Sequence, residues 1–474
     1  MVFASLEFLT LFLPLFFLAY LLTPQRGRNF TLLVGSWVFF TWWTPRYLVL
    51  LIALTTLAFV AALAIERCRS ELWRTRIMAL AITLNLLCLC WYKYANMLVL
   101  SLLELLHHQG VAIPAGFAWE SVALPIGLSF TVLHAISYLV DVRRGVVRAQ
   151  TSFIAFSAYM AMFGHLIAGP IVRYKVIEKE LRERQFHPHD FAMGVRRFMV
   201  GFSMKVLIAD TLSPLVAQIF STTSPSFVDA WSGCIAYTLQ LYFDFAGYSA
   251  MAIGLGLMLG FYFQENFNQP YLASSIQDFW RRWHMTLSSW LRDYLYISLG
   301  GSRGGNFFTY RNLMLTMAIG GLWHGGESWN FLIWGIIHGT ALCVERVCTQ
   351  RGLSLPDPLA RGLTLLTVML AWTVFRADGF AAACSMWGGQ FGLHGWGLSD
   401  TLALSLTPVI KWTVVVGIVC VIYPAFPWYR TGVPGFRTEW WRSSWKNYWP
   451  VLTFAYALAV LSGQSVRPFL YFQF

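Results

Sequence analysis

Two histidines occupy the segments of this chain best suited to acid–base chemistry, and His324 is the clearer candidate. It lies in Gly320-Gly-Leu-Trp-His-Gly-Gly, where glycines on both sides break a helix and let another group approach closely. Imidazole changes charge near neutral pH, so its position suits proton transfer. The alternative is a structural histidine that hydrogen bonds the carbonyls freed by the break. We favour a catalytic role for His324, because an ionisable side chain within an apolar run usually marks a functional site.

His284 is the second candidate, and its helical spacing defines its neighbours. Arg281, His284 and Ser288 are expected to share one helix face, while Asp278 and Arg282 have the i,i+4 spacing of an ion pair. From spacing alone, an amphipathic interfacial helix with salt bridges explains this segment better than a catalytic site does.

The remaining embedded polar residues have simpler interpretations. His134 and His338 are expected to be packing histidines, and so is His165, although His165 also has a position from which it can line a cavity. Asp141 and Asp244 are expected to pair with arginines. The glycine-rich 300–305 segment matches no phosphate-binding loop and predicts a flexible turn. The eight cysteines form no CxxC pair, so neither a metal site nor a disulfide framework is predicted.

Composition places these residues in a membrane protein. Of 474 residues, 57% are hydrophobic and only 12% are charged, whereas soluble domains have about 25% charged residues. The net charge of +12 comes from arginines and lysines in short loops between apolar runs, which is typical of cytoplasmic loops rather than of a nucleic-acid surface. We therefore predict one integral-membrane domain over 1–474, an all-α polytopic bundle of about 10–12 helices.

Apolar runs and basic loops together predict the path through the membrane. The predicted spanning segments are 5–22, 30–43, 48–65, 77–106, 121–140, 198–220, 231–263, 362–376, 405–425 and 449–462. Segment 151–172 lies between two basic loops, so a re-entrant element explains it better than a full span. Segment 264–311 is too charged to cross lipid and is expected to be interfacial or buried by protein on the cytoplasmic side.

A second re-entrant element is predicted at 312–343. Its apolar arms, 312–321 and 329–343, are each shorter than the roughly 20 residues that a spanning helix needs. Arginines flank both arms. We therefore expect a hairpin that dips into the membrane, with His324 near its tip.

Many of these segments resemble the membrane-bound O-acyltransferase (MBOAT) family, and within it the alginate and cellulose O-acetylase type. The similar segments, in chain order, are Met1-Val-Phe-Ala-Ser, Pro125-Ile-Gly-Leu-Ser-Phe-Thr, His165-Leu-Ile-Ala-Gly-Pro-Ile-Val-Arg, Asp244-Phe-Ala-Gly-Tyr-Ser, Glu265-Asn-Phe-Asn-Gln-Pro-Tyr, Phe279-Trp-Arg-Arg-Trp-His-Met-Thr-Leu-Ser, Trp290-Leu-Arg-Asp-Tyr-Leu-Tyr-Ile, Gly321-Leu-Trp-His-Gly, Phe375-Arg-Ala and Phe469-Leu-Tyr-Phe-Gln-Phe. One departure is Ser298, where this type usually has proline. The resemblance implies a fold around a central funnel or tunnel.

The resemblance also implies which residues act. The family's invariant histidine falls on His324 and its second histidine on His284. His324 would be the general base or a transient acyl carrier, and His284 would orient the thioester or stabilise developing charge. The substrate-binding residues would be Arg281, Arg282 and Arg303, which would meet the phosphates of a CoA donor, together with Trp323, Asp244 and His165.

The implied reaction takes an acetyl group from cytoplasmic acetyl-CoA, with no bound cofactor or metal. The acceptor would be a periplasmic SGNH-type acetyltransferase within an exopolysaccharide synthesis and export complex, at the bacterial inner membrane. Two alternatives stay open: D-alanyl transfer, and a polysaccharide-related transporter or flippase. Transporters usually have paired halves with interrupted helices in matching positions, and this sequence has no such repeat.

Overall fold

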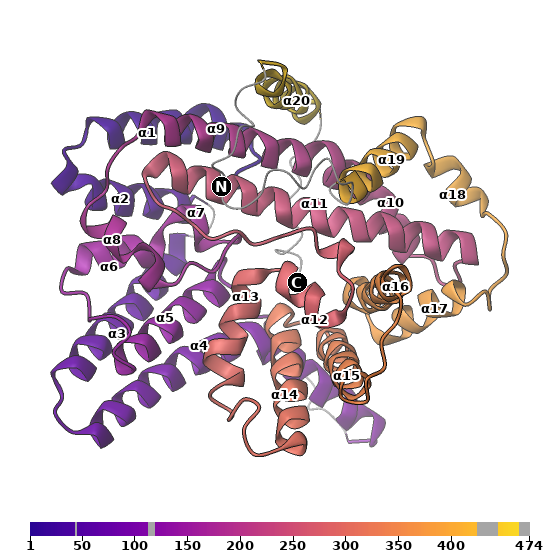
Figure 1. Ribbon diagram of the computed structural model, residues 1–474, viewed down its shortest axis with the longest axis horizontal. Coiled ribbons are helices and arrows are strands. Elements are labelled where there is room, and N and C mark those ends of the chain that lie inside the picture. Colours follow the sequence, from indigo (N-terminus) through magenta and orange to yellow (C-terminus); the bar gives the residue numbers. More distant parts are fainter. Residues whose placement is uncertain (43–44, 112–118, 424–443, 464–474) are drawn as a thin grey trace.

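The computed structural model describes residues 1–42, 45–111, 119–423 and 444–463, and every regular element among them is a helix (Figure 1). The first half contains η1 (Phe8–Phe12), α1 (Leu13–Leu22), α2 (Arg28–Thr41), α3 (Leu48–Arg67), α4 (Glu71–His108), α5 (Leu128–Arg143), α6 (Phe153–Ala161), α7 (Phe163–Leu166), α8 (Tyr174–Arg182), α9 (Pro188–Ser203), η4 (Met204–Ala209) and α10 (Asp210–Phe220). The second half contains α11 (Phe227–Leu259), α12 (Ile276–Arg282), α13 (Met285–Trp290), η6 (Leu291–Tyr296), α14 (Asn306–His324), α15 (Asn330–Gln350), α16 (Asp357–Arg376), α17 (Phe380–Gln390), α18 (Asp400–Ser405), α19 (Pro408–Ile422) and α20 (Ser444–Ser462). Short 3₁₀ turns are η2 (Gln25–Gly27), η3 (Pro45–Tyr47) and η5 (Pro270–Leu272).

The predicted class, an all-α polytopic membrane protein, is confirmed. Within the described residues, six helical stretches are long and apolar enough to cross a membrane. They are Pro45–Arg67, Glu71–His108, Pro188–Phe220, Phe227–Leu259, Asn330–Gln350 and Asp357–Arg376. Leucine, valine and tryptophan side chains stay exposed on the outer faces of several of these helices, as expected where lipid rather than water covers the protein.

Several helix boundaries differ from the predicted ones for local reasons. The predicted 121–140 span becomes helical only at Leu128, because Pro125 and Gly127 form a turn before it. Gly127 has a φ of +77°, and a Cβ there would lie 2.6 Å from the carbonyl oxygen of Leu166, so only glycine fits this turn. The 198–220 span begins ten residues earlier, at Pro188. Helices α17 and α18 were not predicted, and the connection between the predicted 405–425 and 449–462 spans lies mostly outside the described residues.

Segment 151–172 folds as two short helices followed by irregular backbone. α6 ends at Ala161, Met162 breaks the helix, and α7 ends at Leu166. Side chains from Phe156 to Val172 are buried. Protein therefore covers the irregular backbone, as a re-entrant element requires. The depth of this segment in the bilayer stays a prediction.

The α14–α15 hairpin carries the candidate histidine, and its two helices are longer than expected. They contain 19 and 21 residues, so the predicted short arms are wrong; polar residues such as Arg311 and Arg346 continue the helices beyond the apolar cores. The helices pack at backbone distance through glycine. A Cβ at Gly321 would lie 2.2 Å from the carbonyl oxygen of Phe331, and one at Gly335 would lie 2.3 Å from that of Met317.

A long buried helix, α11, forms the centre of the molecule beside α9 and α10 (Figure 1). Lys205 of η4 makes ion pairs of 2.7 Å with Asp244 on α11 and 2.6 Å with Asp210. All three side chains are buried. Asp244 thus pairs with a lysine, and the predicted arginine partner is wrong. Asp141 likewise accepts a hydrogen bond from Tyr294 and lies 3.8 Å from Lys175.

Candidate active site

His324 is the last residue of α14, in a buried aromatic environment. The helix ends there because the backbone of Gly325 is extended. The imidazole lies between Trp334 of α15 and Phe375 of α16, with ring centroids 5.2 Å and 5.6 Å away. Asn330, at the start of α15, fixes the hairpin to the end of α16. Its side-chain amide donates a 2.8 Å hydrogen bond to the carbonyl of Ala377. Three helices therefore hold His324 in place.

The carbonyls at the end of α14 are satisfied by a neighbouring helix. The last carbonyls of any helix have no partner within it. Here Tyr94 of α4 donates its hydroxyl to the carbonyl of Leu322 at 2.8 Å, and the buried ammonium of Lys93 donates to the carbonyl of Trp323. The Lys93 nitrogen also lies 5.7 Å from the centre of the Trp323 ring. A cation at a helix C-terminus is favoured by the helix dipole.

His284 reaches His324 from a different part of the chain. It lies between α12 and α13 with left-handed backbone angles, φ 42° and ψ 53°, which are strained for a residue other than glycine and recur at functional sites. The two imidazole centroids are 6.4 Å apart. The His284 side chain is fully buried. The turn at His284 therefore brings together the two histidines that the sequence singled out.

Because of this turn, the predicted helix face shared by Arg281, His284 and Ser288 is wrong. Because the helix breaks after Arg282, Arg281 and Ser288 belong to separate helices. The predicted i,i+4 ion pair is confirmed: Arg282 lies 2.9 Å from Asp278. Segment 264–311 was expected to be either interfacial or buried by protein. Around this site it is buried by protein, as shown by the buried side chains of Phe279, Trp280, Trp283 and Trp290.

A polar network holds the His284 ring. Its Nδ1 lies 3.1 Å from Oδ1 of Asn266, which also accepts hydrogen bonds from the backbone N–H and the hydroxyl of Thr286, at 3.3 Å and 2.8 Å. The Asn266 amide group donates to Ser249 at 3.1 Å. Burial lowers the pKa of His284 to about 3, so the ring is neutral at neutral pH.

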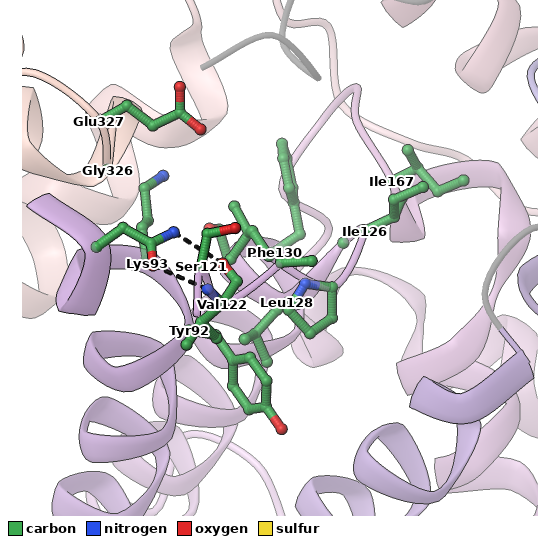
Figure 2. Close-up of a pocket in the computed structure, with 16 residues that line it drawn as sticks. Tyr92, Lys93, Ser121, Val122, Ile126, Leu128, Phe130, Ile167, Gly326 and Glu327 are labelled. Carbon is green, nitrogen blue, oxygen red and sulfur yellow. Dashed lines mark hydrogen bonds between the residues drawn. The ribbon is translucent and has the colours of Figure 1, made fainter. Parts of the chain in front are cut away.

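A cavity of about 480 Å³ adjoins the end of the hairpin (Figure 2). Figure 2 shows Lys93, Gly326 and Glu327 along one side, with Ile126 and Ile167 on the other. Its lining consists of Tyr92, Lys93, Asn96, residues 121–130, Ile167, Gly326 and Glu327. His324 does not line this cavity. Lys93, which lines the cavity, donates its hydrogen bond to the carbonyl of Trp323, the residue before His324.

The predicted substrate-binding residues do not lie together. Trp323 is next to His324 and is buried, whereas Arg281 and Arg303 are exposed and Arg282 is half-buried. His165 lies in α7 with its ring 4.8 Å from that of His134, and Asp244 is part of the Lys205 ion-pair cluster. His338 packs against Trp334, with ring centroids 4.9 Å apart, as predicted for a packing histidine.

Two residues of this site were missed by the sequence analysis. Lys93 carried a usable signal, because a lysine within a long apolar run is rare and functional by default. Asn266 is an ordinary polar residue in the Glu265-Asn-Phe-Asn segment. Its place beside His284 depends on the tertiary fold, so spacing along the chain could not reveal it.

The structure combines a polytopic helical fold with a buried pair of imidazoles. The chain belongs to the membrane-bound O-acyltransferase family, whose sequence model matches residues 70–353. Both His284 and His324 lie within the matched region. The transporter or flippase alternative is thereby set aside, and the protein is an O-acyltransferase.

Three similar proteins are bacterial acyltransferases. The chain is 42% identical to the "Probable alginate O-acetylase AlgI" of Azotobacter vinelandii over 507 aligned positions, covering 100% of both chains. It is 33% identical to the peptidoglycan O-acetyltransferase of Helicobacter pylori, covering 82% of this chain and 79% of the relative. The teichoic acid D-alanyltransferase of Streptococcus thermophilus is 30% identical over 46% of this chain and 56% of its own length.

Proposed function

We propose that this protein transfers acetyl groups from cytoplasmic acetyl-CoA to an extracytoplasmic acceptor that serves O-acetylation of an exopolysaccharide. The observation that carries the proposal is the buried pair of imidazoles, His284 and His324, at 6.4 Å. Full-length similarity to alginate O-acetylases supports the acetyl group and the polymer class. Similarity to a D-alanyltransferase extends over less than half of the chain, so acetyl transfer is favoured over D-alanyl transfer.

The donor reaches this pair from the cytoplasmic side. The connections after α3 and α5 are rich in arginine, and arginine-rich connections are typical of the cytoplasmic side. Arg144, just after α5, donates to the main-chain carbonyl of Asp293 and to Ser298, and Arg173 makes a 2.7 Å ion pair with Asp293. These bonds join η6 to the basic side. The exposed guanidinium groups of Arg281 and Arg303 are available there for the CoA phosphates.

The acceptor reaches the pair from the opposite side. The cavity beside Lys93 is lined by residues 121–127, which follow the end of α4 remote from its basic N-terminal connection. By the charge rule that end is extracytoplasmic. The acceptor is a periplasmic SGNH-type acetyltransferase of an exopolysaccharide complex at the bacterial inner membrane, and its hydroxyl approaches through this cavity.

Within the site, His324 and His284 are the catalytic residues, and the ring of Trp323 lies 5.1 Å from that of His324 and 5.6 Å from that of the cavity residue Phe130. His324 serves as general base or transient acyl carrier. Its aromatic surroundings keep water out, which limits hydrolysis of the thioester and strengthens electrostatic interactions. No metal is required by this scheme.

A donor-competition assay tests the proposed function. Purified protein in nanodiscs is given radiolabelled acetyl-CoA or a D-alanyl-loaded carrier protein, with an SGNH-type acetyltransferase as acceptor. We expect label on the acceptor from acetyl-CoA only. Label from the D-alanyl carrier, with none from acetyl-CoA, would overturn the proposal.

A further inference from the structure

The hydrogen bonds around Asn266 fix the orientation of its side-chain amide. A backbone N–H can only donate, and that of Thr286 lies 3.3 Å from one side-chain atom of Asn266. That atom is therefore the oxygen, Oδ1. The Thr286 hydroxyl fits this orientation: it accepts from the backbone N–H of Ile171 at 2.9 Å and can donate its own proton to Oδ1 at 2.8 Å.

The same oxygen then determines the tautomer of His284. Carbonyl oxygen accepts and never donates, so Nδ1 of His284, 3.1 Å away, carries the proton. In a neutral imidazole with a protonated Nδ1, Nε2 has a lone pair. Among the described residues, buried Nε2 has no hydrogen-bond partner. It is an unused proton acceptor beside His324.

We propose that Asn266 is a positioning residue that holds His284 in its Nδ1–H tautomer, so that Nε2 accepts the proton of the attacking hydroxyl. This inference rests on the proposed acetyl transfer and deepens it. It replaces the expectation that His284 stabilises negative charge, because an Nε2 lone pair repels an oxyanion. In this pair His284 is the base and Asn266 is the third group that orients it, an arrangement that recurs in enzymes.

The acceptor oxygen bonds to the acetyl carbonyl carbon while its proton moves to Nε2 of His284. The carbon–sulfur bond of the thioester breaks, the sulfur leaves with the bonding pair, and the imidazolium of His284 returns the proton to that thiolate. In this step His284 takes the base role that was open to His324, and His324, 6.4 Å away, contacts the acyl group.

The effect of pH on this step depends on the charged groups around His284. His324 is the neighbouring imidazole, with its ring 6.4 Å away; Lys93 of α4 bonds to the carbonyl of Trp323, and Asp244 of α11 is paired with Lys205. Asn266→Asp adds a carboxylate at Nδ1, which keeps the tautomer and stabilises the imidazolium. Asn266→Asp should therefore raise the pKa of His284.

The experiment compares Asn266→Asp and Asn266→Ala with Asn268→Asp, which makes the same charge change at an exposed residue two positions away. Acetyl transfer by each variant is measured against pH in nanodiscs. We expect Asn266→Asp to move the acid limb of the kcat/KM profile up by about 1 pH unit or more. Asn266→Ala should lower kcat at least about tenfold with an unchanged KM for acetyl-CoA. Asn268→Asp should match wild type.

A purely structural role for Asn266 predicts a different result: less folded protein, with an unmoved acid limb in Asn266→Asp. That outcome overturns the proposal. A second readout needs no activity. In protein with ¹⁵N-labelled histidine, the His284 signals, assigned by their loss in His284→Gln, should show protonated Nδ1 and unprotonated Nε2. The opposite tautomer overturns the inference, whereas absence of acetyl transfer with the expected tautomer would overturn only the proposed function.

Discussion

Lys93 and Trp323, 230 positions apart in the chain, are joined by a hydrogen bond from the ammonium group to the main-chain carbonyl beside His324. This bond ties α4, whose Lys93 lines the cavity, to the end of the hairpin. The placement of His324 therefore depends on α4, a helix that is far from it in the chain.

Lys93→Met should impair catalysis more than folding. Loss of the donor leaves a buried carbonyl unsatisfied, which costs about 1–3 kcal/mol, and a shift of His324 by about 1 Å is enough to lower kcat roughly 100-fold. Tyr94→Phe removes the adjacent hydrogen bond without a charge change and should lower kcat much less. Thermal unfolding and acetyl transfer of both variants in nanodiscs measure the difference. Equal, small losses in the two variants would contradict this role for Lys93.

Gly321→Ala should force α14 and α15 apart. Its Cβ would lie 2.2 Å from the carbonyl oxygen of Phe331, which is backbone and cannot rotate away. Overpacking of this kind costs about 1–3 kcal/mol, so the unfolding midpoint and activity should both fall. Gly362→Ala, where a Cβ meets nothing within 4 Å, is the matched control and should be neutral or stabilising. Unchanged unfolding in Gly321→Ala would show that the hairpin packs differently.

Lys205→Met should destabilise the protein without changing its chemistry. It leaves Asp210 and Asp244 buried without their cation, and breaking a buried ion pair costs about 3–5 kcal/mol. Asp357→Asn breaks an exposed pair, Arg361–Asp357, and should cost at most about 1 kcal/mol. The measurements are the yield of folded protein and kcat per folded molecule. A selective fall in kcat with normal stability would assign Asp244 to the substrate path instead.

The double variant Arg281→Ala/Arg303→Ala should weaken donor binding alone. Losing two exposed charges near the CoA phosphates should raise the KM for acetyl-CoA by about 3–10-fold at low salt, with little effect at high salt. Acetyl-pantetheine lacks the nucleotide phosphates, so its KM should not change. Arg26→Ala, on the exposed connection η2, is the control. An equal rise in KM for both donors would argue against phosphate contacts.

The sequence predicts local features of this fold well and tertiary ones poorly. The helical membrane class, the Asp278–Arg282 pair and the break at His324 all follow from composition, i,i+4 spacing and glycine. The turn at His284 was missed, because nothing in Arg-Arg-Trp-His signals left-handed backbone. Lys205 as the partner of Asp244 depends on how α9 and α11 pack, which local patterns do not encode.

The most direct test of the central claim is acetyl transfer by His324→Ala, compared with His107→Ala at an exposed histidine. Both proteins are purified, checked for the wild-type unfolding midpoint, and assayed with radiolabelled acetyl-CoA and an SGNH-type acceptor. We predict a loss of at least about 100-fold in His324→Ala and wild-type activity in His107→Ala. Full transfer by folded His324→Ala would contradict the assignment of this site.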